Sequence, residues 1–178
     1  MMVDESNPKK NDKVTQTWLC LRFTHLALNS AGIAANGPRA AAIIHQQQIW
    51  QCNSAAGKSA IRPQMSSNHA TMLCSEFEVR VRDTDLEAQK LQELAYWAYR
   101  FTSLVSIYND HSLLLEIGKS IKLFKSLNHL LHLIYNDLNG FQIQTEMGTG
   151  ATPKAAHAMS FNATEEPAAV SKRETELD

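Results

Sequence analysis

The chain has 178 residues, 44% of them hydrophobic, which is enough for one domain with its own core and too few for several domains. Its net charge of −1 and isoelectric point near 6.6 exclude a positive field over the whole molecule, so contact with nucleic acid would need a local basic patch or a partner. Cys20, Cys52 and Cys74 form no CxxC pair, which favours reduced thiols over a disulfide framework or a zinc site. No apolar run reaches the about 18 residues of a membrane span, so we expect a cytoplasmic protein without membrane contact.

The first half of the chain predicts short elements. Residues 1–16 are polar and charged and predict a disordered tail. The nearly continuous apolar run 17–23 predicts a central strand covered on both faces, followed by a helical turn or two over 25–30 and a loop over 31–39. Residues 40–45 and 48–52 predict a hairpin that turns at Gln46–Gln47.

Two small helices and a connector should follow this hairpin. Asn53 can cap a helix over 54–59, and Ser66 or Ser67 can cap a second helix that ends near Leu73. Residues 77–82 alternate apolar and charged side chains, which predicts a half-exposed strand or an extended connector.

The second half carries stronger patterns. A long helix should run from Asp83 or Thr84 to Tyr99, and alternating apolar residues on either side of Asn109–His111 predict an antiparallel hairpin. An amphipathic helix over 126–138 should end at Asn139–Gly140 in the left-handed conformation. A strand over 141–147, a short helix over 153–160 and a disordered tail over 161–178 complete the chain.

This order of elements predicts an α+β fold. The strand at 17–23 and the elements from about residue 93 to 160 match a mixed, ferredoxin-like sheet covered by helices. The intervening region, about 25–92, would be an insertion, most of which (25–82) precedes the long helix. We therefore expect one ordered unit over 17–160.

Several separated tracts resemble the Y-family (translesion) DNA polymerases. They are TWLCLRFTHLAL at 17–28, IWQCNSAAGKSAIRPQM at 49–65, AYRFTSLVS at 98–106, LLLEIGKSIKLF at 113–124 and ATPKAAHAM at 151–159. Their order is closest to the ImuB-like branch, whose members are polymerase-like partners in error-prone damage tolerance. The resemblance implies a ferredoxin-like palm with a small fingers insertion.

The resemblance also implies that the catalytic positions are lost. Phosphoryl transfer in this family uses two metal ions held by carboxylates. The first-strand aspartate aligns with Cys20, and the Asp-Glu pair of the hairpin aligns with His111 and Ser112. A one-residue slip would bring in Asp110 but would turn the apolar hairpin residues out of the core. We therefore expect no bound metal, no cofactor and no polymerase activity.

The nucleotide-binding positions are lost in the same way. The family's tyrosine and arginine of the fingers align with Ser54 and Gly57, and its late lysine aligns with Ala158, beside a basic match at Lys154. The two Gly-Lys-Ser tracts lack the earlier glycine of a phosphate-binding loop. The histidines show no metal-ligand spacing with a nearby carboxylate.

Three functions stay open. By resemblance, the favoured one is a noncatalytic scaffold or accessory subunit of translesion synthesis that contacts a RecA-like accessory protein, an error-prone polymerase and the sliding clamp. The second is a truncated, degenerate fragment, because the residues after Ser160 leave no room for a thumb, a little finger or a clamp-binding segment. The third is a weak DNA-binding module, whose basic face would comprise Arg80, Arg82, Arg100, Lys119, Lys122 and Lys125.

Overall fold

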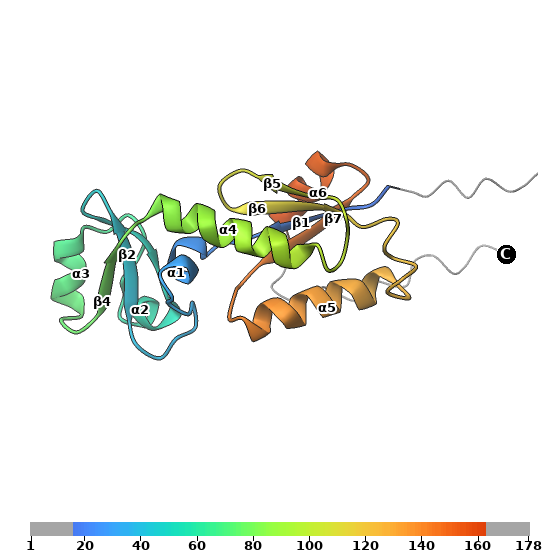
Figure 1. Cartoon of the computed structure of the whole chain (residues 1–178). Helices are drawn as coiled ribbons and strands as arrows, with labels where there is room; N and C mark the ends of the chain where they lie inside the picture. The colour runs from blue at the N-terminus through green and yellow to red at the C-terminus, as the bar shows by residue number, and fades with distance from the viewer. Residues whose placement is uncertain (1–15, 163–178) are drawn as a thin grey trace, which may run out of the picture.

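The computed structural model describes residues 16–162 and shows an α+β fold with two sheets (Figure 1). The fold class predicted from the sequence is therefore confirmed. The tails predicted at 1–16 and 161–178 lie outside the described residues, apart from Gln16, Phe161 and Asn162. Phe161 is not part of a free tail, because its ring packs against His157 and Arg22.

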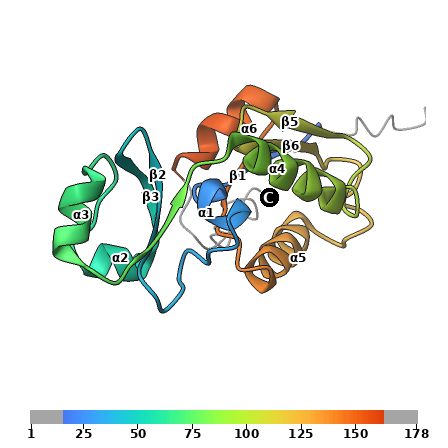
Figure 2. The same cartoon turned by 60° about the vertical axis from the view of Figure 1, so that its left-hand side comes forward.

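The larger sheet, here called the palm, has four antiparallel strands in the order β5-β6-β1-β7. Helices α4 and α5 cover one face of this sheet, and α6 covers the other (Figure 2). The bounds are β1 Trp18–Arg22, α4 Thr84–Ala98, β5 Val105–Tyr108, β6 Ser112–Glu116, α5 Leu127–Gly140, β7 Glu146–Gly150 and α6 Pro153–Ser160.

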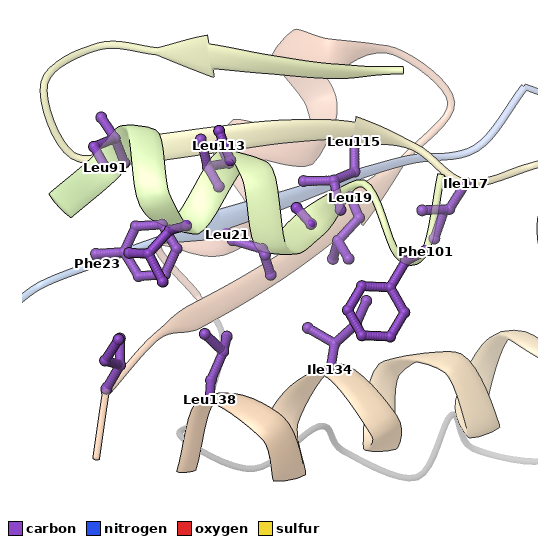
Figure 3. Close-up of a cluster of buried hydrophobic side chains, with 14 of the residues drawn as sticks. Leu19, Leu21, Phe23, Leu91, Phe101, Leu113, Leu115, Ile117, Ile134 and Leu138 are labelled. Carbon is purple, nitrogen blue, oxygen red and sulfur yellow. The ribbon is translucent and has the colours of Figure 1, made fainter. Parts of the chain in front are cut away.

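The two central palm strands are buried on both faces, as the apolar run at 17–23 predicted. Alternate residues of β1 and β6 enter the main core with α4 and α5 (Figure 3). The residues between them, Cys20 and Leu114, pack under α6 against Ala156. The main-core side chains drawn in Figure 3 include Leu19, Leu21, Phe23, Leu91, Phe101, Leu113, Leu115, Ile117, Ile134 and Leu138.

Strand β7 differs from the sequence-based expectation. The strand predicted at 141–147 lies at Glu146–Gly150, and the left-handed residue after α5 is Gln142 (φ 59°) rather than Gly140. The prediction failed because Gly148 and Gly150 were interpreted as turn residues. A Cβ on Gly150 would lie 2.7 Å from the backbone nitrogen of Ala156, so these glycines serve the close approach of α6.

The smaller sheet, here called the fingers, has the order β3-β2-β4, with β4 parallel to β2 at one edge. Helices α2 and α3 pack on one face, and α1 packs on the other. The turn at Gln46–Gln47 is confirmed; both residues have positive φ (50° and 62°), the conformation that suits a two-residue hairpin. The bounds are α1 Leu26–Ser30, β2 Ala41–His45, β3 Gln48–Cys52, α2 Ser54–Lys58, α3 Ser67–Leu73 and β4 Glu78–Val81.

Side-chain caps fix where the helices begin. The predicted caps Asn53 and Ser66 accept hydrogen bonds from the first turns of α2 and α3, and Asp83 does the same for α4. Within residues 16–162, none of the helices combines the length and apolar character that crossing a membrane requires.

Candidate functional site

The tip of the β5–β6 hairpin lies beside the end of β1. The backbone N–H of Phe23 donates to the carbonyl of His111 (2.9 Å), and Arg22 is paired directly opposite Ser112. Cross-strand partners point to the same face of a sheet, so Arg22 and Ser112 are neighbours. Cys20 is paired opposite Leu114, two residues further into the sheet.

Cys20 is therefore a diagonal neighbour of Ser112, one same-face residue pair further from the hairpin tip. It is fully buried under α6, and burial raises the pKa of its thiol, with a hydrogen bond to Ser160 and the charge of Arg22 acting in the opposite direction. The structure places Arg22 directly opposite Ser112, and it places Cys20 diagonally from Ser112 on the same face of the sheet. The family correspondence of Cys20 stays a prediction.

Arg22 is held at this place by contacts on two sides. Its guanidinium forms an ion pair with Glu146 of β7, and it lies over the ring of Phe161 with its central carbon 4.2 Å from the ring centre. Within the described part of the chain, its Nε and the Oγ of Ser112 are buried without a hydrogen-bond partner. A positive charge is thus fixed next to Ser112.

A cavity of about 230 Å³ separates this end of the palm from the fingers. The hairpin tip contributes Asp110 and His111, β3 contributes Trp50 and Gln51, and the segment leading into α4 contributes Arg82. The complete lining is Arg22, Phe23, Thr24, Leu26, Trp50, Gln51, Arg82, Glu87, Asp110 and His111. A larger cavity of about 570 Å³ adjoins it and shares Thr24, Trp50 and Gln51.

Apart from Arg22, which is paired with Glu146, the ionisable groups that line the smaller cavity are paired with one another. Arg82 donates two hydrogen bonds to Glu87 (2.7 and 2.8 Å) and lies 4.1 Å over the ring of Trp50. The carboxylate of Glu87 raises the pKa of Arg82. His111 Nδ1 lies 2.6 Å from Asp110 Oδ1, and this hydrogen bond lowers the pKa of Asp110.

The two fingers positions singled out by the resemblance lie on α2. Ser54 is its first residue and is exposed, and Gly57 is half-buried; neither lines the two cavities described above. The guanidinium of Arg62 donates to the carbonyl of Gly57 (2.5 Å), so a cation that sequence reasoning had not considered lies against this helix.

On α6, Lys154 and Ala158 are both exposed, whereas the neighbouring His157 is packed. The His157 ring lies between Tyr108 and Phe161, with ring centres 4.9 and 5.0 Å apart. The palm end of this surface is therefore built from aromatic rings and Arg22, and no sequence pattern indicated that grouping.

The residues at the hairpin tip do not fit the pair of magnesium ions that the family resemblance implies. Magnesium prefers carboxylate oxygens in octahedral geometry. Here the three side chains at the meeting point of β1 and β6 are a guanidinium, an imidazole and a buried hydroxyl: Arg22, His111 and Ser112. The carboxylate of the hairpin tip, Asp110, is hydrogen-bonded to His111. A fixed cation also repels a divalent ion at short range.

Solved structures define the class of protein. A Dbh ternary complex matches with TM-score 0.64 and 8% identity, covering 83% of this chain and 45% of that chain. The insertion ternary complex of Dbh DNA polymerase matches with TM-score 0.65 and 9% identity (83% and 46%), and DinB from Sulfolobus solfataricus with 0.60 and 8% (83% and 46%). The fold is that of the palm and fingers of Y-family DNA polymerases.

The particular family follows from the sequence itself. The model of the impB/mucB/samB family matches residues 22–160, so this chain belongs to that family. No sequence among the curated proteins matches it. The chain spans about half the length of the solved polymerases that it resembles.

Proposed function

We propose that this protein is a noncatalytic member of the impB/mucB/samB family that acts in translesion DNA synthesis as a scaffold or accessory subunit of the ImuB-like kind. The family match and the palm-and-fingers fold support the general role. The observation that carries the noncatalytic part is Arg22, whose cationic side chain lies opposite Ser112 at the hairpin end.

We infer that Arg22, rather than Cys20, occupies the place of the family's first-strand carboxylate. Ligands of one metal pair must converge on one point, so the first-strand ligand has to be a neighbour of the two hairpin positions. Arg22 meets this condition most directly because it is paired with Ser112, whereas Cys20, on the same face of β1, is paired with Leu114 and packs against Ala156 of α6. Either assignment removes all three carboxylates.

Primer extension tests the absence of catalysis directly. With magnesium or manganese, on intact or damaged template, the protein should give no product above the level of a reaction without enzyme. Metal-dependent extension that survives repurification would contradict the proposal.

Metal binding tests the assignment of Arg22. The triple variant R22D/H111D/S112E should bind manganese detectably in calorimetry, because it brings three carboxylates to one end of the sheet. The matched control C20D/H111D/S112E should bind at least tenfold more weakly, since its first carboxylate lies under α6. Equal binding by both variants would refute the assignment, and circular dichroism should confirm that both are folded.

The scaffold role makes a separate claim about partners. We expect the protein to bind at least one of three purified partners by resemblance: a RecA-like accessory protein, an error-prone polymerase or the sliding clamp. Size-exclusion chromatography of each mixture would show a shared peak. Failure with all three would favour the alternative of a degenerate fragment.

A further inference from the structure

Strand β4 forms an open edge of the fingers sheet (Figure 1). It pairs with β2 on one side only, and all four of its residues are exposed. Val81 is 74% exposed and Val79 is 40% exposed, whereas the alternating sequence at 77–82 predicted a half-exposed strand or an extended connector. An edge strand with exposed valines is a template for pairing with another strand.

The hydrogen bonds to β2 show which backbone groups of β4 remain available. The N–H groups of Glu78 and Arg82 donate to the carbonyls of Ala40 and Ile44 (2.8 Å each). Successive residues of a strand direct their backbone groups to opposite sides, so the even-numbered residues face β2. The N–H and C=O groups of Phe77, Val79 and Val81 therefore point away from the sheet.

The side chains of β4 also divide by position. Val79 and Val81 are paired with Ala42 and Ile44, which places them on the α2–α3 face. Glu78 and Arg80 lie on the opposite face, where their side chains form an exposed ion pair (2.8 Å). The same edge thus offers a row of apolar side chains on one face and one charge of each sign on the other.

These positions are self-complementary under a two-fold axis. If Val79 pairs with its own copy, Phe77 pairs with Val81 of the second copy, and all outward backbone groups of the three residues can form antiparallel ladder bonds. In that register Glu78 lies opposite Arg80 of the second copy, and Arg80 lies opposite its Glu78. Opposite charges directly across an antiparallel pair are stabilising.

Repulsion between like charges also disfavours the two neighbouring registers of this strand pair. A shift by one pairing step in either direction keeps the backbone pattern but places Glu78 opposite a second Glu78, or Arg80 opposite a second Arg80. Like charges directly opposite one another are destabilising. Only the register centred on Val79 satisfies the backbone groups and both charges together.

We propose that two copies of this protein associate through β4, which joins their fingers sheets into one continuous six-stranded sheet with the order β3-β2-β4-β4-β2-β3. This association is distinct from the proposed role in translesion synthesis and does not depend on it. The contact is narrow, so the dimer should be weak and in exchange with the monomer, as expected of interfaces below about 1,200 Å².

Charge exchange at two positions tests the proposal. In sedimentation velocity, the wild-type protein should show concentration-dependent dimers. The single variants E78R and R80E should each lose self-association by at least tenfold, because each places like charges opposite one another. An equimolar mixture of E78R and R80E should recover a dimer, since every cross-strand pair is again of opposite charge.

The recovered mixture is the discriminating result, because misfolding of either variant could abolish its own dimer but could not create a mixed one. V79P provides a second arm: it removes an outward-pointing N–H without removing a bond to β2, and it should also weaken the dimer at least tenfold. A wild-type protein that stays monomeric up to about 1 mM would overturn the proposal and leave the edge to another protein's strand. So would variants that dimerise as the wild type does, or a mixture that stays monomeric.

Discussion

At the scale of single residues, Cys20 shows how burial controls the chemistry of a thiol. Burial raises its pKa, so the folded protein keeps this proton at a pH where the unfolded chain, with a thiol pKa of about 8.5, releases it. The unfolded state then binds fewer protons than the folded state, and stability falls as the pH rises above about 8.5. Below that pH both states are protonated and this site adds no pH dependence.

The first prediction follows from this fall of stability at high pH. Urea unfolding at pH 7.5 and at pH 10 should show a larger loss of stability in the wild type than in Cys20→Ala. Cys52, whose pKa is also raised by burial, is present in both proteins, so its contribution cancels. Equal pH dependence in the two proteins would show that Cys20 ionises as easily in the fold as in the unfolded chain.

Arg82 and Glu87 form a largely buried ion pair that links the end of β4 to α4, with side chains only 13% and 8% exposed. Removing one partner leaves the other charge buried without compensation. We predict that Arg82→Met lowers the free energy of unfolding by about 3 kcal/mol. The double variant R82M/E87M should recover most of this loss, as measured by chemical denaturation.

The contact of Arg82 with Trp50 is the control for that experiment. If the loss came from this stacking contact, the double variant would be as unstable as the single one, because both lack the guanidinium. Recovery in the double variant would show that the loss of unfolding free energy came from the unpaired carboxylate of Glu87.

At the scale of elements, the seam between β7 and α6 depends on two glycines. A Cβ on Gly148 would collide with the backbone of α6 at Ala156, Met159 and Ser160, and backbone atoms cannot move aside as a flexible side chain can. We predict that Gly148→Ala destabilises the protein by about 3 kcal/mol or more, an overpacking effect measured by thermal or chemical unfolding.

Gly140 is the matched control for Gly148. It is the last residue of α5, a Cβ placed there meets no atom within 4 Å beyond its chain neighbours and the nearby backbone of its own helix, and its φ is not positive. Gly140→Ala should therefore be neutral or stabilise by up to about 1 kcal/mol, through helix propensity and reduced freedom of the unfolded chain. Comparable losses in both variants would contradict the steric explanation.

At the scale of the whole molecule, ion pairs weaken the case for a DNA-binding face. Among the basic residues expected to line such a face, Arg80, Arg82 and Arg100 are each paired with a carboxylate, from Glu78, Glu87 and Asp137 respectively. Phosphate contacts supply most nonspecific affinity for DNA. We predict binding to primer–template DNA weaker than about 10⁻⁵ M near physiological salt, measured by fluorescence anisotropy.

Asp137→Asn serves as the control in the same titration. It leaves Arg100 without its carboxylate, so any DNA affinity should rise and depend more steeply on salt. Submicromolar binding by the unmodified protein would instead show that the basic residues form a phosphate-binding face, and would place the DNA-binding module ahead of the scaffold.

Local patterns in the sequence were enough to predict most of the helices and strands. Periodicity predicted β1, α4, the β5–β6 hairpin and α5, and side-chain chemistry predicted the caps Asn53 and Ser66. These features depend on residues close together in the chain. Local patterns could not show that α6 packs back onto β7. The glycines of β7 were therefore interpreted as a turn, although the close approach of α6 is what requires them.

Which side chains become neighbours depends on how the strands and helices pack in three dimensions. The pairing of β1 with β6 brought Arg22 to Ser112 and left Cys20 under α6, and the position of β4 at a sheet edge exposed Val81. The meeting of Arg22, Trp50, Arg82 and His111 at one cavity joins four separate segments of the chain. Strand register and sheet order are relations between distant segments, so local patterns that predict each strand correctly carry no information about its neighbour.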